Sequence, residues 1–454
     1  MSASVFDGAL SADRILPGDA NDDYTHDEAL GGVPVVPLAV LIPETTDEVA
    51  AIVRLCDEQR IPVTARGSGT GLSGAAIPRQ DGILVSFERM NKILEIDTVN
   101  HVAVVQPGVT LTELDEATAE VGFVYPVYPG ELSASLGGNV NTNAGGMRAI
   151  KYGVTRHHVL GLQAALPTGE VIRTGGKFVK ASTGYDLTQL IVGSEGSLAL
   201  VTEAVLKLQP RLSDQATILV PFPDLASVMT AVPQVVGSGL GPLILEYIDA
   251  LTMGAITYTH DLQLGIPDAV KEKAQAYLVV MLESNSAARL DEDIEKAGEL
   301  LTELGALDVY SLPGGAARKL IEAREHAFFT AKGAGADDII DTVLPRAALP
   351  EFFTKVLAIA QGNQTLIVGC GHAGDGNVHL AVFQKDAEAR HKVLHELFSA
   401  GMALGGAISG EHGIGREKKR HFLELEDPGK IELMRRIKHA FDPQGILNPG
   451  VLFN

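Results

Sequence analysis

The sequence predicts an α+β protein of two to three domains, and three observations support this fold class. The chain has 454 residues, and soluble domains commonly hold about 100–200 residues each. Residues 33–210 are rich in glycine and β-branched runs, whereas strands alternate with helical stretches from about residue 213. Apolar residues make up 46% of the chain and charged residues 20%, which is enough apolar material for large cores and excludes disorder as the main state.

The first half is expected to begin with a helix. Thr45 and Glu48 have the spacing of a capping box, which marks a helix start. The apolar face that follows at helical spacing consists of Val49, Ile52, Val53 and Cys56, so we expect Cys56 in the core. Strands are expected at 61–63, 82–87 and 101–105.

The second half alternates strands with helices. Strands are expected at 218–220, 243–248, 277–282, 365–368 and 380–383, and helices at 290–305 and 316–331. Past residue 387 the pattern is helical again. This alternation is typical of an α+β module, and no internal repeat or coiled coil interrupts it.

Charge and cysteine content exclude several classes of protein. Lys and Arg total 36 against 57 Asp and Glu, and the resulting charge of -21 disfavours binding to nucleic acid or anionic lipid. The two cysteines, Cys56 and Cys370, cannot ligate an iron–sulfur cluster alone, and they indicate a reducing compartment. Residues 1–20 lack the pattern of a signal peptide, and no apolar stretch is long enough to span a membrane. We therefore expect a cytoplasmic protein.

Glycine accounts for 49 residues, and the first glycine-rich segment is 66–74. Gly69, Gly71 and Gly74 form a literal G-x-G-x-x-G after a predicted strand. A Rossmann dinucleotide site would need a helix directly after these glycines, but another strand follows by residue 82. We favour a loop whose backbone N–H groups bind an anion beside Arg66, and a flexible surface loop is the alternative.

Two further segments share this composition. Residues 137–147 are small residues and amides, which suits a large planar ligand that lies against backbone and needs donors for ring heteroatoms. Residues 193–198 lead into a strand that we expect to end near Thr202 and Glu203. Three such segments within 140 residues indicate one large cofactor.

Two glycine-flanked turns carry the strongest chemical signal. His372 and His379 are seven residues apart, and Glu411 and His412 lie in a second turn at 409–416. A set of two His and one Glu binds a divalent metal and leaves positions open for substrate, although core packing is the alternative for any single His. Zn²⁺, Mn²⁺ and Fe²⁺ all suit these ligands. Cys370 is near enough to be a soft ligand, but we expect it in the core.

One arginine is a candidate anchor for a substrate carboxylate. A helix that places Ala327 and Phe328 inward would direct Arg324 toward a carboxylate, which its guanidinium binds in a bidentate manner. The alternative is an Arg324 that is solvated or paired with Glu325.

These motifs together resemble the vanillyl-alcohol-oxidase/p-cresol-methylhydroxylase (PCMH) superfamily of FAD-linked enzymes. The resemblance rests on the 67–74 loop, on 136–146 and on 193–204, and it covers nearly the whole chain. It is closest to the D-subunit of glycolate oxidase and to flavin-dependent D-lactate and D-2-hydroxyacid dehydrogenases. It implies an N-terminal segment (1–32), a PCMH-type FAD-binding domain of two α+β subdomains (33–212), an α+β substrate or cap domain with an antiparallel sheet (213–400), and a C-terminal helical segment that returns to the flavin (401–454).

The resemblance also implies a set of residues around FAD. The first loop has no His of the kind that tethers FAD in some relatives, so we expect non-covalent FAD. The implied cofactor residues are Arg66, Gly67, Ser68, Gly69, Thr70, Gly71, Ser73, Pro129, Gly130, Glu131, Ser135, Gly137, Gly138, Asn139, Thr142, Asn143, Gly145, Gly146, Tyr152, Gly153, Glu195, Gly196, Val201 and Asn448.

For catalysis, the resemblance implies oxidation of a D-2-hydroxyacid by metal-assisted proton abstraction and hydride transfer to flavin N5. His372, His379 and Glu411 match metal ligands, with Zn²⁺ favoured, and His412 matches the base. The substrate residues would be Arg324, Arg346 and Asn377.

The implied substrate is D-lactate or glycolate. Residues 337–340 lack the Lys that precedes Asp341 in the D-2-hydroxyglutarate enzymes, so a dicarboxylate is disfavoured. The alternatives are a D-2-hydroxyglutarate dehydrogenase, a sugar-acid dehydrogenase and an FAD-binding electron-transfer subunit of a multisubunit glycolate oxidase. Electrons would pass to a quinone, a cytochrome, a partner flavoprotein or an iron–sulfur subunit, with peripheral attachment to a membrane through that partner and a homodimer both left open.

Overall fold

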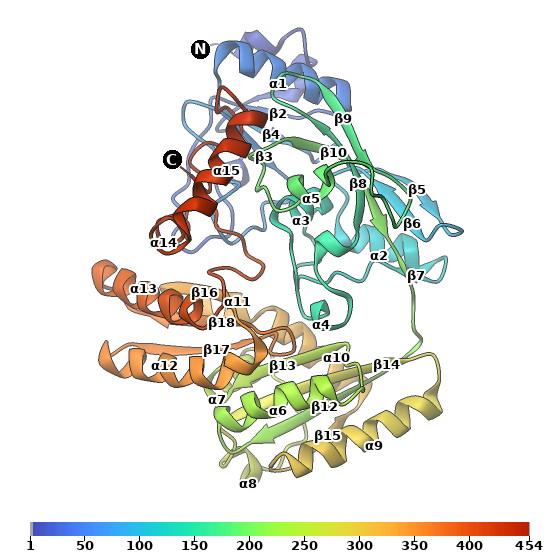
Figure 1. Cartoon of the computed structure of the whole chain (residues 1–454), viewed down its shortest axis with the longest axis vertical. Coiled ribbons are helices and arrows are strands. Elements are labelled where there is room, and N and C mark those ends of the chain that lie inside the picture. The colour runs from blue at the N-terminus through green and yellow to red at the C-terminus, as the bar shows by residue number, and fades with distance from the viewer. Residues whose placement is uncertain (1–2, 454) are drawn as a thin grey trace.

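Two sheets form the upper half of the molecule in Figure 1, in a computed structural model that describes residues 3–453. The first sheet has the order β1-β2-β4-β3, and its strands β2, β4 and β3 are parallel. These strands are β1 (Ile15–Pro17), β2 (Ala39–Leu41), β3 (Val63–Arg66) and β4 (Ile83–Ser86). The second sheet is antiparallel and consists, in spatial order, of β5 (Ile93–Asp97), β6 (Val102–Val105), β10 (Leu200–Lys207), β8 (Val159–Ala165) and β9 (Val171–Gly175).

Short elements surround these two sheets. The helices are α1 (Thr46–Gln59), α2 (Leu111–Ala119), α3 (Leu136–Thr142), α4 (Ala149–Tyr152) and α5 (Leu187–Ile191), and β7 (Phe123–Val124) pairs with β11 (Gln209–Pro210). The 3-10 turns of the chain are η1 (Ala3–Phe6), η2 (Ala12–Arg14), η3 (Asp22–Thr25), η4 (Thr155–His157) and η5 (Arg346–Ala348). Within the predicted N-terminal segment (1–32), residues 12–14 form a 3-10 turn and residues 15–17 form the edge strand of the first sheet. The predicted domain limits remain a prediction.

Helix α1 shows how a sequence signal translates into structure. Its predicted apolar face is fully buried, Cys56 included. Thr45 is the N-cap and accepts a hydrogen bond from the Glu48 amide, as expected. The reciprocal half of the capping box is wrong, because the Glu48 carboxylate instead accepts from the Glu44 amide and from Arg14. A nearby guanidinium offers a stronger, charge-assisted bond than a backbone amide.

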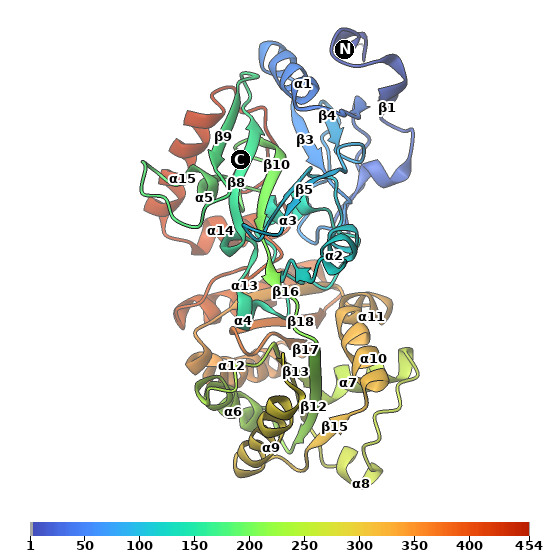
Figure 2. The same cartoon turned by 90° about the vertical axis from the view of Figure 1, so that its right-hand side faces the viewer.

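A seven-stranded antiparallel sheet spans the lower half of the molecule (Figures 1 and 2). In spatial order its strands are β15 (Tyr310–Leu312), β12 (Asp214–Phe222), β14 (Ala276–Ser284), β13 (Ile244–Asp249), β17 (Leu366–Gly371), β18 (Asn377–Phe383) and β16 (Asp338–Val343). One face packs against α6 (Leu225–Gly237), α9 (Ala287–Glu303), α12 (Leu349–Gly362) and α13 (Ala387–Ala403), and the other against α7 (Ala250–Thr259), α8 (Asp268–Lys271), α10 (Gly314–Glu325) and α11 (Ala327–Gly333).

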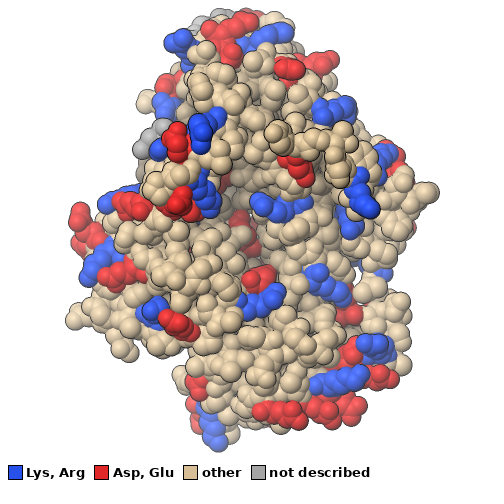
Figure 3. Space-filling view, in the orientation of Figure 1, with Lys and Arg blue, Asp and Glu red and all other residues tan. Residues whose placement is uncertain are grey.

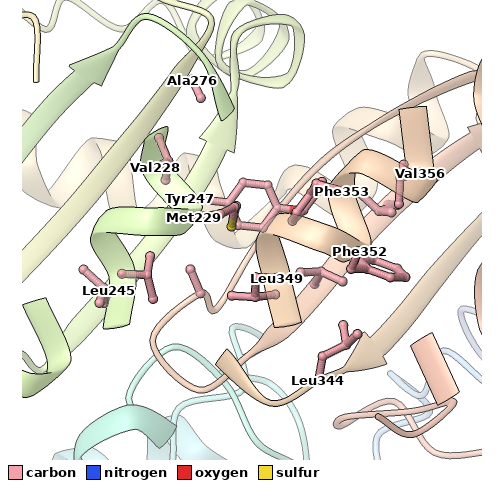
Figure 4. Packing of buried hydrophobic residues seen from close by; sticks show 14 of the residues in the cluster. Val228, Met229, Leu245, Tyr247, Ala276, Leu344, Leu349, Phe352, Phe353 and Val356 are labelled. Carbon is pink, nitrogen blue, oxygen red and sulfur yellow. The ribbon is translucent and has the colours of Figure 1, made fainter. Parts of the chain in front are cut away.

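Side-chain alternation along the strands fills both faces. Ile218, Val220 and Phe222 of β12 pack with α6 and α9, whereas Leu219 between them packs with α7 and α10. Figure 4 shows the first of these cores, where the rings of Tyr247 and Phe353 meet edge to face with centroids 5.2 Å apart. This double-sided packing gives β13, β17 and β18, the strands that carry the candidate site, a rigid setting.

The C-terminal segment crosses back to the upper half, as the predicted fold class requires. Helices α14 (Lys419–Leu425) and α15 (Pro428–Phe441) lead to a bridge between Leu447 and Val63 of β3 (Figure 1). Asn448 follows that bridge directly and reaches the glycine-rich loops. Residues 409–448 therefore touch both halves of the molecule.

Three local expectations need correction. The strand after residues 193–198 does not end near Thr202, because β10 begins at Leu200 and continues to Lys207. The strand expected at 61–63 begins only at Val63 and continues to Arg66 as β3. The stretch 316–331 is divided between α10 and α11. The remaining predicted strands and helices are found, and no helix within residues 3–453 is long and apolar enough to cross a membrane.

Candidate active site

The three glycine-rich segments surround one cavity of about 410 Å³ in the upper half. It lies between the loop after β3, the start of α3 and the loop that precedes β10. Of the predicted cofactor residues, its wall contains Arg66, Gly67, Ser68, Gly69, Thr70, Gly71, Ser73, Pro129, Gly130, Glu131, Ser135, Gly137, Gly138, Asn139, Thr142, Gly145, Glu195, Gly196, Val201 and Asn448. We call this space the glycine-lined cavity.

Its shape depends on the absence of side chains at specific positions. A Cβ on Gly67 would lie 1.8 Å from Ser135 Oγ, and one on Gly137 would lie 2.5 Å from Cβ of Pro107. Gly69 has φ +77° and lies directly over the Arg66 guanidinium. The glycines therefore let backbone segments approach each other closely enough to form a continuous wall.

Unpaired polar atoms make this wall fit a heteroaromatic cofactor such as FAD. Asn139 Nδ2 and Asn141 Oδ1 are buried, and neither has a hydrogen-bond partner among the described residues. Buried polar groups are rarely left unpaired, and a flat ring system with donors and acceptors at its edge would satisfy both. Arg66 is buried beside the cavity and donates to the carbonyl of His26 at 2.6 Å, so its charge is held in place near the first loop.

Four predicted cofactor residues do not line the cavity. Asn143 ends α3 in a left-handed conformation and accepts from the Arg156 amide. Gly146 packs its Cα against the Tyr128 carbonyl, and Gly153 packs against the ring of His157. The Tyr152 hydroxyl donates to Glu283, in the lower half. The sequence motif therefore includes residues that shape the wall from behind.

The predicted metal ligands converge across β17, β18 and the 409–416 loop. His372 Nε2 lies 3.1 Å and His379 Nε2 lies 3.2 Å from the same oxygen, Glu411 Oε1. The two imidazoles meet edge to face, 4.9 Å apart between centroids. Two imidazole nitrogens and a carboxylate oxygen at such separations are a donor set that suits a divalent transition metal. We call these three residues the histidine cluster.

Glu246 is a site residue that the sequence reasoning missed. It is fully buried on β13, and its Oε1 lies 2.6 Å from His372 Nδ1 while its Oε2 lies 2.7 Å from a guanidinium nitrogen of Arg324. A carboxylate on Nδ1 fixes the imidazole tautomer that leaves Nε2 free for a metal. An acidic residue in the middle of the apolar 243–248 strand was the signal that could have revealed it.

Asp341 on β16 holds the loop that carries Glu411 and His412. Its buried carboxylate accepts hydrogen bonds from the Ser409 hydroxyl and from the amides of residues 410, 411 and 412. Asn377 Nδ2 donates to the other Asp341 oxygen at 2.7 Å. Despite burial, the charges of His412 and Lys418 keep the pKa of Asp341 below its usual range. Asn377, predicted as a substrate residue, therefore lies behind the loop and supports it.

His412 lies at the centre of the arrangement. Its ring stacks on His379 with centroids 5.0 Å apart, and its Nδ1 lies 4.0 Å from Asp341 while Nε2 lies 4.0 Å from Glu411. Burial lowers the pKa of His412 to about 4, although Asp341 favours the charged form. The imidazole is therefore neutral near pH 7 and able to accept a proton.

Glu195 joins the two halves at this point. Its buried carboxylate accepts from the Ile414 amide at 2.8 Å and from the Gly415 amide at 2.7 Å, on the loop just after His412. Asn448 Nδ2 donates to the carbonyls of Ala75 and Glu195. The hydrogen bonds of Glu195 and Asn448 therefore hold the wall of the glycine-lined cavity next to the loop that carries Glu411 and His412.

A second cavity of about 500 Å³ lies on the lower side of the cluster. Its wall includes Arg324, Cys370, His372, His379, Glu411 and His412, and much of the remainder is apolar. The Nε of Arg324 is buried and lacks a hydrogen-bond partner within residues 3–453, whereas Nη2 is ion-paired with Glu246 at 2.7 Å. We call this space the apolar chamber; a hollow between the two halves, with acidic side chains inside, is visible in Figure 3.

Arg346 does not reach the chamber wall. It is exposed in η5, and its Nε donates to the Gly374 carbonyl in the turn between His372 and His379. The prediction that it binds substrate is therefore not supported by its position, because its guanidinium supports that turn from outside. Cys370 is buried as expected, and burial raises its thiol pKa to about 11.

Solved structures define the class of protein to which this fold belongs. The chain superimposes on p-cresol methylhydroxylase with a TM-score of 0.78 at 17% identity, covering 99% of this chain and 95% of that one. It superimposes equally on 4-ethylphenol oxidase from Gulosibacter chungangensis, with a TM-score of 0.78 at 19% identity and coverage of 99% and 96%. The fold is therefore the PCMH-type FAD-binding fold, as predicted.

Sequence relatives identify the family. Residues 37–175 match the family described as FAD binding domain, and residues 211–452 match FAD linked oxidases, C-terminal domain. The chain belongs to this family of FAD-linked oxidoreductases. It is 36% identical to a D-lactate dehydrogenase of Anaerostipes hadrus, over 97% of this chain and 95% of the relative. It is 37% identical to the glycolate oxidase subunit GlcD of Bacillus subtilis (strain 168), over 99% and 94%.

Proposed function

We propose that this chain is an FAD-dependent dehydrogenase that oxidises a D-2-hydroxyacid to the 2-oxoacid. One observation carries the proposal: Glu411 and His412 line both the glycine-lined cavity and the apolar chamber. A substrate held in the chamber would therefore be in contact with a base, a metal-binding carboxylate and the cofactor space at once. The relatives named D-lactate dehydrogenase and glycolate oxidase subunit support the same reaction class.

Each residue of the site has a separate role in the proposed reaction. When bound, FAD in the glycine-lined cavity would supply a two-electron acceptor, and a divalent cation on the histidine cluster would supply a Lewis acid. Arg324 would bind the substrate carboxylate through its guanidinium, whose Nε has no partner among the described residues while Nη2 faces Glu246. His412 Nε2 would accept the hydroxyl proton, while Asp341 keeps the His412 backbone in place.

The chamber also limits the substrate. Within the part of the chain that the structure describes, Arg324 is the only Lys or Arg in the chamber wall. A second substrate carboxylate would have no cationic partner there, so D-lactate or glycolate is favoured over a dicarboxylate such as D-2-hydroxyglutarate. A sugar acid is also disfavoured, because its several hydroxyl groups would face an apolar wall.

One observation favours a second candidate, a D-2-hydroxyacid with a longer apolar side chain. The chamber wall beyond the histidine cluster consists largely of Leu251, Ala255, Leu366, Ala381 and Phe383, and its 500 Å³ exceeds what lactate needs. Burial of each additional CH₂ against such a wall contributes about 0.8 kcal/mol. Longer substrates should then have a lower KM than D-lactate.

The test is anaerobic mixing of the FAD-loaded protein with glycolate, D-lactate, D-2-hydroxyhexanoate and D-2-hydroxyglutarate. Bleaching of the flavin absorbance by a monocarboxylate supports catalysis on this chain, and the rank order separates the two candidates. No bleaching with any hydroxyacid would favour an electron-transfer subunit instead. The variant His412→Ala should retain FAD and lose the bleaching, and normal bleaching in that variant would refute the role of His412 as base.

The electron acceptor is part of the same proposal. The described residues contain only Cys56 and Cys370 as cysteines, both buried and on different elements, so an iron–sulfur cluster would have to belong to another protein. We therefore place the acceptor outside the chain, as a quinone, a cytochrome, a partner flavoprotein or an iron–sulfur subunit.

A further inference from the structure

A second group of histidines lies outside the histidine cluster, on helices α13 and α14. His391 and His395 are one turn apart on α13, and His421 and Glu424 are three residues apart on α14. Residues at these spacings share one face of a helix. The two faces meet where α13 and α14 pack together (Figure 1).

The side chains of this group converge. The rings of His391 and His421 are stacked with centroids 4.6 Å apart, and the ring of His395 is 6.0 Å from that of His421. One nitrogen or oxygen atom from each of His391, His421 and Glu424 lies within 4.8 Å of the others. His395 Nδ1 also lies 3.4 Å from Glu424 Oε2.

The innermost histidine has an unused polar atom. His421 is 4% exposed, and its Nδ1 finds no hydrogen-bond partner in the described part of the chain. Its ring packs against Phe398, 5.2 Å away between centroids. Packing alone would be served as well by a purely apolar ring, because a buried nitrogen without a partner carries a desolvation cost.

We propose that His391, His421 and Glu424 form a second metal site, with His395 as the fourth ligand. Ligand atoms around a tetrahedral ion with bonds of about 2.0–2.1 Å are roughly 3.4 Å apart, so the separations among His391, His421 and Glu424, which lie within 4.8 Å, must shorten by about 1.4 Å at most. His395 Nδ1 is already 3.4 Å from Glu424 Oε2. Glu424 is exposed and His391 only half-buried, so both can move inward. Nitrogen donors with one carboxylate select an ion of the Zn²⁺, Co²⁺ or Ni²⁺ class over Mg²⁺ or Ca²⁺.

Such an ion would connect α13 to the segment that follows the 409–416 loop. Helix α14 begins directly after Lys418, whose ammonium lies 4.0 Å from the Asp341 carboxylate. Asp341 also anchors residues 409–412. The second site would thus fix the C-terminal end of the loop that carries Glu411 and His412, as a structural site rather than one that binds substrate.

The competing explanation is a histidine stack without a metal. Glu424 Oε1 accepts from Arg420 Nε at 3.0 Å, and this pair could satisfy Glu424 alone. The two explanations differ in one measurable quantity, the number of ions that the chain binds.

The test is equilibrium dialysis of chelator-treated, FAD-loaded protein against Co²⁺, with the bound metal counted by elemental analysis. The double variant His391→Ala with Glu424→Ala removes two ligands that are not fully buried, so His421 stays in place. A matched control, His439→Ala with Glu432→Ala, removes one exposed His and one exposed Glu from α15. We expect the double variant to bind one Co²⁺ per chain fewer than the wild type, and the control to bind as the wild type does.

Co²⁺ bound by the histidine cluster can be distinguished from Co²⁺ bound at the second site. The variant Glu411→Gln weakens metal binding by the histidine cluster, and this protein should still bind one Co²⁺ at the second site. Adding His391→Ala and Glu424→Ala to the same protein should abolish binding of that ion. Co²⁺ should also raise the Tm of the Glu411→Gln protein but not that of the combined variant. Equal Co²⁺ content in wild type and double variant, with both holding FAD normally, would overturn the proposal. If the double variant lacks FAD because it does not fold, His391→Gln alone must lower the Co²⁺ affinity at least tenfold.

Discussion

The glycine-lined cavity and the histidine cluster lie next to each other but are built in opposite ways. The cavity wall is mostly backbone and small side chains, and its fit depends on where Cβ atoms are absent. The cluster is made of titratable side chains, of which His372 is held by the buried Glu246 carboxylate and Glu411 is held through its backbone amide by the buried Asp341 carboxylate. Substitutions should therefore act through shape in the first region and through chemistry in the second.

The boundary between the two regions is narrow. A Cβ on Gly145 of the cavity wall would lie 2.7 Å from Glu411 Oε2 in the cluster. Because the regions touch, their separate roles are best tested by variants that damage one property and leave the other intact. FAD content reports on the cavity, and metal content together with flavin reduction reports on the cluster.

The largest difference between loss of flavin reduction and retention of FAD is expected for Glu411→Gln. The amide keeps the size of the side chain but removes the negative charge that faces His372 and His379. We expect flavin reduction to slow by about 1,000-fold, since Lewis-acid stabilisation is worth several kcal/mol, whereas FAD content should not change. The measurements are stopped-flow flavin reduction, flavin absorbance and elemental analysis.

The control for this variant is Glu303→Gln on α9, which changes the same charge on an exposed surface. It should reduce flavin at the wild-type rate. Undiminished activity in verified metal-free wild-type protein would contradict the role of the cluster. Loss of FAD from Glu411→Gln would show instead that the two regions are not separable.

A substitution at Gly137 should have the opposite effect, with FAD binding weakened and metal content unchanged. A Cβ there would meet the backbone of Pro107 at 2.9 and 3.1 Å, which cannot move aside as a flexible side chain can. Overpacking of this kind costs about 1–3 kcal/mol, so Gly137→Ala should weaken FAD binding by about 10–100-fold. Fluorescence titration with FAD measures this, while metal content should stay at the wild-type level. Gly254→Ala on α7, where a Cβ meets open space, is the matched control, and equal FAD affinity in both variants would argue against a shape-dependent wall.

These two regions also differ in how well the sequence predicts them. The cluster was predicted residue by residue, because His and Glu side chains act directly and their glycine-flanked turns are recognisable. The cavity was predicted as a segment, so Asn143 and Tyr152 were included although they face away from it. A motif in one dimension does not show which of its members face the ligand.

Long-range partners explain the remaining misses. Glu246 lies 126 positions from His372, and nothing in either local pattern connects them. Glu195 lies in the cavity wall, where the cofactor prediction needs it, but the sequence does not reveal that its carboxylate also accepts from amides 219 and 220 positions away. Fold class and most elements follow from local periodicity, whereas pairings of this kind appear only when the sheets are assembled.

Glu195→Gln tests the connection between the two regions. The Gln side chain offers one acceptor oxygen where Glu195 offers two, so one of the amides of Ile414 and Gly415 would face an NH₂ group. An unmade buried hydrogen bond costs about 1–3 kcal/mol, and we expect roughly tenfold losses in both FAD affinity and the rate of flavin reduction. A loss confined to one of the two measurements would mean that Glu195 serves a single region rather than joining them.

The smallest effect is expected for Arg346→Ala, which separates support of the cluster from contact with substrate. Arg346 is exposed and donates to the Gly374 carbonyl, whereas Arg324 is buried in the chamber wall and its Nε has no partner among the described residues. Loss of this single, partly buried hydrogen bond costs about 0.5–1.5 kcal/mol, so the rate of flavin reduction should fall by less than about tenfold with KM unchanged. Arg324→Ala provides the comparison, because loss of a charge-assisted partner for the carboxylate should raise KM by about 100-fold. Steady-state kinetics with the substrate that bleaches the flavin measures both values. A KM for Arg346→Ala as high as that for Arg324→Ala would mean that Arg346 moves into the chamber when substrate binds.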